Sequence, residues 1–191
     1  MSEPEVAASP RRRIAPFIAL AAAAVLGGLF WLLAGSDTSS TDTASSFLIG
    51  KPAPAVVTTN LDGESFDLSR RKGSWVVLNF FNSTCVPCKA EHPDLVEFAR
   101  QQASFAGGAE LYTVINDDSD DAVRAWFAER GGDWPIIKDD NGSIAVAFGV
   151  AKVPETWVID PSGTVQARFP GVTTADALGT LIQQLRISQG E

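Results

Sequence analysis

A near-continuous apolar run covers residues 75–81 (Trp-Val-Val-Leu-Asn-Phe-Phe), and Asn79 is its one polar position. A run this rich in β-branched and aromatic side chains predicts a central strand that is buried on both faces. A short polar segment follows the run, and a helix is predicted over residues 86–104. We expect the folded part of the chain to be organised around this strand and this helix.

Shorter apolar runs predict the other elements of an α/β fold. Two strands, 56–59 and 65–68, flank an Asp-Gly pair that favours a hairpin turn. The remaining predicted elements are a strand at 110–116, a helix ending near 130, a strand at 134–138, a helix at 143–148, strands at 156–160 and 164–169, and an amphipathic helix at 174–188. This order predicts a mixed β-sheet flanked by helices.

The N-terminal part of the chain has a different pattern. Three arginines at 11–13 precede residues 14–34, which carry no charged side chain and match the roughly 20 residues that cross a bilayer as a helix. These features predict one transmembrane signal anchor, with residues 1–13 in the cytoplasm. A cleaved signal peptide is the alternative. Both place the rest of the chain outside the cytoplasm, and the anchor makes it a single-pass protein of the cell membrane.

Small polar residues fill positions 35–46 and predict a flexible linker, so that the extracytoplasmic domain covers residues 47–191. The net charge is −8, from 23 acidic and 15 basic residues, which argues against a nucleic-acid partner. The basic run 70–73 is most simply a solvated turn.

The two cysteines, Cys85 and Cys88, lie between the predicted central strand and its helix. A helix N-terminus favours the thiolate form of a cysteine, and a cysteine three residues on lies one turn away. This geometry suggests that Cys85 attacks and Cys88 resolves. A structural zinc ion needs four ligands, whereas the chain has two cysteines and one histidine. Covalent haem attachment needs a histidine at position 89, which is Lys89. A purely structural disulfide is the remaining alternative, although so short a loop stabilises little.

Two stretches, VVLNFFNSTCVPCKAEHP (76–93) and FGVAKVPETWVIDPSGTV (148–165), resemble the membrane-anchored TlpA/ResA/CcmG (DsbE-like) proteins. The resemblance covers residues 50–185. It implies a thioredoxin fold with an N-terminal β-hairpin and a central βα insert. It also implies a thiol–disulfide oxidoreductase that acts outside the cytoplasm, without a metal or another cofactor.

The resemblance also assigns roles to individual residues. Cys85 and Cys88 form the redox-active disulfide, with Cys85 as the nucleophile, and Glu91 exchanges protons with the buried thiol. Pro154 matches the cis-proline of the family. The residues expected on the substrate side are Thr84, Pro87, Val153 with its backbone groups, and Glu155.

Two positions depart from the pattern of the family. Thr84 replaces the usual aromatic residue before the first cysteine, and Asn79 replaces the buried Asp of cytosolic thioredoxins. Asn79 cannot act as a base, so that role falls to Glu91 or to water. His92 is expected on the helix surface.

The resemblance implies a reductant in cytochrome c maturation, with apocytochrome c as substrate and a membrane-embedded CcdA-like protein as its redox partner. An oxidant of secreted proteins is the alternative, and only the reduction potential separates the two. A peroxiredoxin-type peroxidase is disfavoured because Leu78 stands where the P-x-x-x-T-x-x-C signature requires proline. A copper chaperone of the related type would pair its cysteines with a distant histidine, and the sequence has none.

Overall fold

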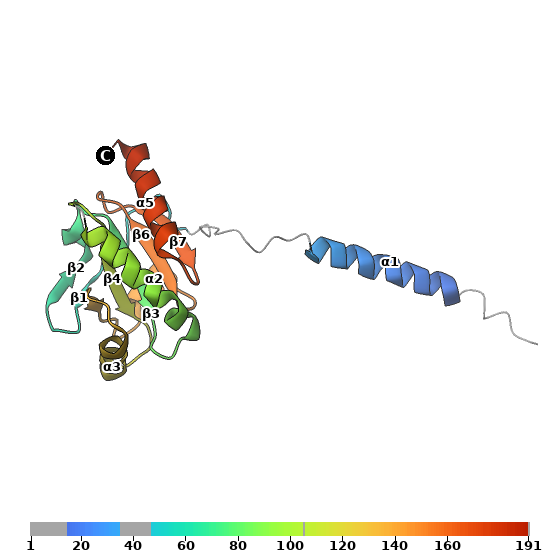
Figure 1. Cartoon of the computed structure of the whole chain (residues 1–191), viewed down its shortest axis with the longest axis horizontal. Helices are drawn as coiled ribbons and strands as arrows, with labels where there is room; N and C mark the ends of the chain where they lie inside the picture. The colour runs from blue at the N-terminus through green and yellow to red at the C-terminus, as the bar shows by residue number, and fades with distance from the viewer. Residues whose placement is uncertain (1–14, 35–46, 105, 191) are drawn as a thin grey trace, which may run out of the picture. The chain divides into compact units, whose positions relative to one another are not determined.

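The computed structural model describes residues 15–34, 47–104 and 106–190 (Figure 1). The chain divides into two compact units, Met1–Thr41 and Asp42–Glu191. The described part of the first unit is the helix α1 (Ala15–Ala34). Within the described residues, no helix combines the length and the hydropathy that a membrane crossing requires. The predicted N-terminal segment 1–13 and the predicted linker 35–46 lie outside the described residues.

The second unit is built on a five-stranded mixed sheet with the strand order β5-β4-β3-β6-β7. The central strand β3 runs parallel to β4 and antiparallel to β6. A separate antiparallel hairpin, β1–β2, precedes the sheet in the chain. The elements in chain order are β1 (Val57–Thr59), β2 (Ser65–Asp67), the 3-10 helix η2 (Leu68–Arg71), β3 (Val76–Phe81), α2 (Val86–Ala103), β4 (Glu110–Ile115), α3 (Asp120–Arg130), β5 (Ile136–Ile137), α4 (Ser143–Phe148), β6 (Glu155–Ile159), β7 (Val165–Pro170) and α5 (Ala175–Gln189).

All six residues of β3 are buried, as the apolar run predicts. Because side chains alternate along a strand, Val77 packs with α2 and α5, whereas Val76 and Leu78 pack with the hairpin and α4. Figure 1 shows α2 and α5 together on one face of the sheet. The second unit therefore has a complete hydrophobic core of its own on both faces of β3.

The segment predicted as a solvated basic turn is largely exposed, with Arg71 half-buried, and residues 72–73 form a turn. Its first two residues, Arg70 and Arg71, also end the 3-10 helix η2. Asp67 begins this helix, because its Oδ1 accepts hydrogen bonds from the Ser69 N–H at 2.9 Å and the Ser69 hydroxyl at 2.7 Å.

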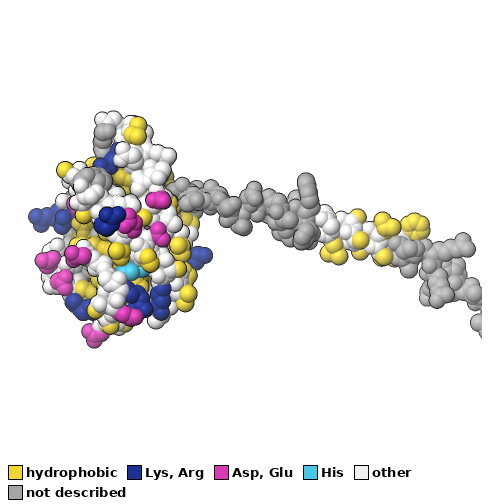
Figure 2. Space-filling model, in the orientation of Figure 1, with side chains coloured by type: hydrophobic (Ala, Val, Ile, Leu, Met, Phe, Trp, Pro, Cys, Tyr) yellow, Lys and Arg dark blue, Asp and Glu magenta, His cyan; other side chains and the backbone are white. Residues whose placement is uncertain are grey.

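Acidic and basic side chains are interspersed with apolar ones over the face of the second unit seen in Figure 2. Several of the charged residues pair locally, as Arg100 does with Glu97 at 2.6 Å and Lys138 with Asp120 at 2.9 Å. Exposed pairs of this kind contribute little to stability. On this face, charges of both signs are therefore spread among apolar side chains.

Candidate active site

Cys85 and Cys88 form a disulfide with an S–S distance of 2.12 Å and a Cα–Cα distance of 5.2 Å. Cys85 is the N-cap residue of α2, and its Sγ accepts a hydrogen bond from the Cys88 N–H at 3.1 Å. Cys85 is partly exposed, whereas Cys88 is only 2% exposed. The accessible sulfur thus lies at the positive end of the helix dipole, which favours its thiolate after reduction.

The loop before Cys85 is fixed by hydrogen bonds to the segment that follows β4. The Asn82 Nδ2 donates to the carbonyl oxygens of Asn116 at 3.0 Å and Asp117 at 2.7 Å. The Asn82 Oδ1 accepts from the Thr84 N–H at 2.8 Å, and Ser83 N–H donates to Asp118 at 2.5 Å. These bonds hold the loop at the carboxyl ends of β3 and β4, where the disulfide begins.

The loop that contains Pro154 borders the apolar cluster that includes Cys88. The Val153–Pro154 peptide bond is cis, as the resemblance implies. Val153 belongs to the same apolar cluster as Cys85 and Cys88. The carbonyl oxygen of Pro154 accepts a hydrogen bond from the Gly171 N–H at 2.9 Å, so that the segment after β7 also borders the site.

Glu91 lies in the interior between α2 and the sheet, with 1% of its surface exposed. Its Oε2 accepts a hydrogen bond from the Asn79 Nδ2 at 2.9 Å, and its Oε1 accepts one from the Thr173 N–H at 2.8 Å. The Asn79 Nδ2 also donates to the Thr156 hydroxyl at 2.9 Å. Asn79 therefore holds the carboxyl in place, at the position where cytosolic thioredoxins carry an Asp.

Burial raises the pKa of Glu91 to about 7, although the hydrogen bonds from Thr173 and Asn79 lower it and the charge of Asp94 raises it further. Cys88 and Glu91 are three residues apart on α2, and both are buried on its inner face. A carboxyl with this pKa suits proton exchange at neutral pH. Glu91 thus places a buried carboxyl with a raised pKa one helical turn after Cys88.

Glu155 occupies a different environment from an exposed substrate contact. Its side chain is 1% exposed, and its Oε2 pairs with Arg168 at 2.7 Å. Its Oε1 accepts a hydrogen bond from the Trp157 Nε1 at 2.9 Å. The carboxylate is therefore engaged within the sheet, and only a rearrangement would present it to a substrate.

His92 was predicted on the surface of the helix, and this prediction was wrong. The side chain is 5% exposed, and its Nε2 lies 2.9 Å from the carbonyl oxygen of Gly131. The ring makes edge contacts with Trp126 and Phe127, at centroid distances of 4.3 and 5.4 Å. Burial lowers the pKa of His92 despite this contact with Gly131. The imidazole joins α2 to the end of α3.

Thr84 and Pro87 are exposed at the start of α2. Val86, between the two cysteines, is 72% exposed, and Val172 in the segment after β7 is 52% exposed. Exposed apolar side chains and exposed charged ones, such as Lys89 and Lys152, thus share the segments around the cysteine pair.

Two contributors to the site were missed from the sequence. Asn82 orders the loop before Cys85, and its position directly after an apolar strand was an available signal. Thr173 binds Glu91 through its backbone N–H from a position 82 residues further on. A backbone donor at that separation leaves no sequence signal. In the described part of the chain, no three His, Cys, Asp or Glu side chains are grouped so as to hold a metal ion.

Comparison with known proteins gives consistent matches. The AhpC/TSA family matches residues 49–168. The thiol:disulfide interchange protein HelX of Rhodobacter capsulatus is 32% identical over 169 residues, which cover 87% of this chain and 91% of HelX. The thiol-disulfide oxidoreductase ResA of Bacillus subtilis is 32% identical over 126 residues, covering 65% of this chain and 69% of ResA.

Solved structures agree. A putative thiol:disulfide interchange protein DsbE from Chlorobium tepidum superposes with a TM-score of 0.65 at 26% identity. The match covers 76% of this chain and 100% of that chain. A thioredoxin family protein from the same organism gives a TM-score of 0.63 at 24% identity and covers 74% of this chain and 98% of that one. The thioredoxin fold is thereby confirmed.

The fold and the cysteine pair define a thiol–disulfide oxidoreductase of the thioredoxin class. The chain belongs to the AhpC/TSA family, and its relatives are the DsbE-, HelX- and ResA-type thiol–disulfide oxidoreductases.

The buried carboxyl predicts a pH-dependent stability of the oxidised protein. Glu91 ionises near pH 4.5 in the unfolded chain and near pH 7 in the folded protein. Between pH 4.5 and pH 7, Glu91 is ionised in the unfolded chain and still protonated in the folded protein. Ionisation therefore stabilises the unfolded state alone, and the free energy of unfolding falls as the pH rises. We expect this contribution to fall by about 3 kcal/mol and to level off above pH 7. Urea unfolding from pH 4 to 8 measures it.

Glu91→Gln should remove this part of the pH dependence, whatever it does to the stability at pH 4. Glu129→Gln is the matched control, because the Glu129 side chain is 69% exposed. If Glu91→Gln and the wild type show the same fall in unfolding free energy between pH 4.5 and 7, Glu91 does not carry the raised pKa.

Proposed function

We propose that this oxidoreductase works as a reductant of protein disulfides outside the cytoplasm. The asymmetry of the pair, with Cys85 partly exposed at the helix N-terminus and Cys88 buried, supports an exchange reaction in which Cys85 attacks. The reducing direction is proposed from the likeness to the ResA- and HelX-type oxidoreductases. In the reduced protein, the Cys85 thiolate attacks one sulfur of the substrate disulfide. The substrate S–S bond breaks, one substrate sulfur leaves as a thiolate, and a mixed disulfide with Cys85 forms.

The second step resolves the mixed disulfide. The Glu91 carboxylate accepts the proton of the Cys88 thiol, and the Cys88 thiolate attacks the Cys85 Sγ. The second substrate sulfur leaves as a thiolate, and the Cys85–Cys88 disulfide forms. Two electrons thus pass from the cysteine pair to the substrate, which ends as a dithiol.

The substrate side consists of Thr84, Pro87 and Val153, with the cis-proline at Pro154. The backbone groups of Val153 are available for hydrogen bonds with an extended peptide. The exposed start of α2 around Cys85 leaves room for a flexible segment that carries a C-x-x-C pair. We propose apocytochrome c, whose C-x-x-C-H thiols must stay reduced for haem attachment, as the substrate.

The oxidised protein then needs a donor of two electrons. A membrane-embedded dithiol protein of the CcdA-like type would supply them by the same exchange in reverse. Reduction outside the cytoplasm requires such a partner, because that compartment lets disulfides persist.

We also propose that residues 14–34 anchor the chain in the cell membrane, with the domain 47–191 on the extracytoplasmic side. The support is the uncharged sequence that follows three arginines, together with the relation to oxidoreductases of the interchange type. An anchor would keep the domain close to a membrane-embedded electron donor.

Single cysteine variants test the order of the steps. Reduced Cys88→Ser should accumulate a mixed disulfide with an oxidised C-x-x-C-H peptide, because the resolving thiol is missing. Reduced Cys85→Ser should form no detectable adduct, since the remaining Cys88 is buried. Mass spectrometry without reductant measures both. Adduct formation by Cys85→Ser at a rate similar to that of Cys88→Ser would contradict the assignment of the nucleophile.

Cell fractionation tests the anchor. The full chain should stay with the membranes after washing at high pH, whereas a chain that starts at residue 35 behind a cleavable secretion signal should be released. N-terminal sequencing of the mature full chain should give a sequence that starts within residues 1–13. A mature chain that begins after residue 34 would replace the anchor with a cleaved signal peptide.

A further inference from the structure

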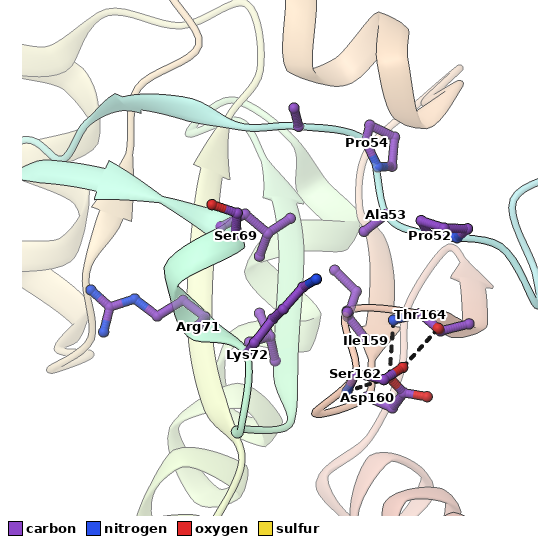
Figure 3. A pocket seen from close by; sticks show the side chains of 14 residues that line it. Pro52, Ala53, Pro54, Ser69, Arg71, Lys72, Ile159, Asp160, Ser162 and Thr164 are labelled. Atoms are coloured by element: carbon purple, nitrogen blue, oxygen red, sulfur yellow. Dashed lines mark hydrogen bonds between the residues drawn. The ribbon is translucent and has the colours of Figure 1, made fainter.

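A cavity of about 240 Å³ lies at the end of the sheet opposite the disulfide. Val76, the first residue of β3, forms part of its wall, whereas the active-site loop follows Phe81 at the other end of that strand. The rest of the wall comes from the segment 52–55, from η2 with Lys72, and from residues 159–164 (Figure 3). The thiol chemistry makes no use of this cavity.

Backbone hydrogen bonds hold the walls of the cavity together. The Ala53 N–H donates to the Gly163 carbonyl at 2.9 Å, and the Gly73 N–H donates to the Pro161 carbonyl at 2.9 Å. Leu68, at the start of η2, is bonded through its N–H to the Val56 carbonyl at 3.0 Å. The cavity is therefore formed before any ligand binds, which limits the entropy that a ligand must lose on binding.

Two charged side chains of the cavity wall, Lys72 and Asp160, have no ion-pair partner among the described residues. Asp160 is occupied within its own turn: its Oδ1 accepts from the Ser162 and Thr164 N–H groups, both at 2.9 Å, and its Oδ2 accepts from Gln166 at 2.6 Å. Lys72 has no ion pair with any described residue. An unpaired cation therefore stands at this cavity in a protein of net charge −8.

Lys72 is also placed by packing. The Lys72 side chain lies close to Gly163: if Gly163 carried a Cβ, that atom would be 3.2 Å from the Lys72 Cε. Figure 3 shows the Lys72 side chain extending into the cavity toward Ala53 and Ile159, whereas Arg71 is directed away from it. The ammonium group thus stands over a largely apolar floor that includes Val76 and Ile159, each 1% exposed.

We propose that this cavity binds a compact organic monoanion, with a carboxylate on Lys72 and an apolar body on the floor below. The Lys72 ammonium has no ion-pair partner among the described residues, and its point-like charge needs no bidentate partner. The oxygens of the Asp160 carboxylate, which lines the same cavity, are bonded to donors of their own turn. The hydroxyl groups of Ser162 and Thr164 lie 2.8 Å apart and already bond to each other. The basic run at residues 70–73 thereby gains a role in recognition, independent of the thiol exchange.

Three small probes test the proposal on the oxidised chain 47–191, which contains the described core. Hexanoate carries both features, acetate carries the charge alone, and 1-hexanol carries the apolar body alone. In ¹H–¹⁵N NMR titrations, hexanoate should shift the amides of the cavity wall saturably, and it should bind at least tenfold more tightly than either other probe. Lys72→Met keeps the stem but removes the charge, and it should weaken hexanoate binding about tenfold or more.

Lys152→Met is the matched control, since Lys152 is an exposed lysine beside the active-site loop and should leave hexanoate binding unchanged. Equal binding of hexanoate and 1-hexanol, or an undiminished affinity in Lys72→Met, would overturn the role of the charge. Shifts confined to the surface around Cys85 would overturn the location. The chain 35–191 should bind hexanoate as 47–191 does. Loss of binding in the longer chain would mean that residues 35–46 fill the cavity, and the proposal of an external ligand would fail.

Discussion

The burial of β3 on both faces positions everything else in the active site. Its two rows of apolar side chains join the layer of α2 and α5 to the layer of the hairpin and α4. Its antiparallel register pairs Phe80 with Glu155 in β6. The segment that follows β3 and the segment that precedes β6 therefore lie at the same end of the sheet. Cys85 and Val153 border the same apolar cluster for this reason, although they lie far apart in the chain. Hydrophobic burial supplies the free energy that keeps this arrangement fixed.

The same strand carries one polar side chain, Asn79, which binds the buried carboxyl of Glu91. Asn79 and Thr173 give the buried Glu91 carboxyl two hydrogen bonds, which limits the cost of placing it in the interior. Burial still favours the neutral form, so the carboxyl keeps its proton in the folded protein up to neutral pH. The group is thus held one helical turn after Cys88 on the buried face of α2. A carboxyl in water would have neither this pKa nor this position.

Local patterns predicted most of the fold, and long-range contacts account for what was missed. The predicted helix at 143–148 matches α4, and the predicted helix at 86–104 differs from α2 by one residue, because apolar periodicity and capping are local. The burial of His92 depends on Trp126 and Phe127, which come from another helix. The partner of Glu155 is Arg168 on the adjacent strand β7. The cysteine spacing indicated the site, whereas the placement of Thr173 required the folded chain.

The reduction potential of the Cys85–Cys88 pair tests the central claim most directly. The domain 47–191 would be equilibrated with dithiothreitol or glutathione buffers, and the oxidised fraction would be measured after acid quenching. A reductant predicts a potential near or below about −250 mV, close to that of thioredoxin. A potential near −120 mV, as in strong periplasmic oxidants, would contradict the account and make the protein a source of disulfides for secreted proteins.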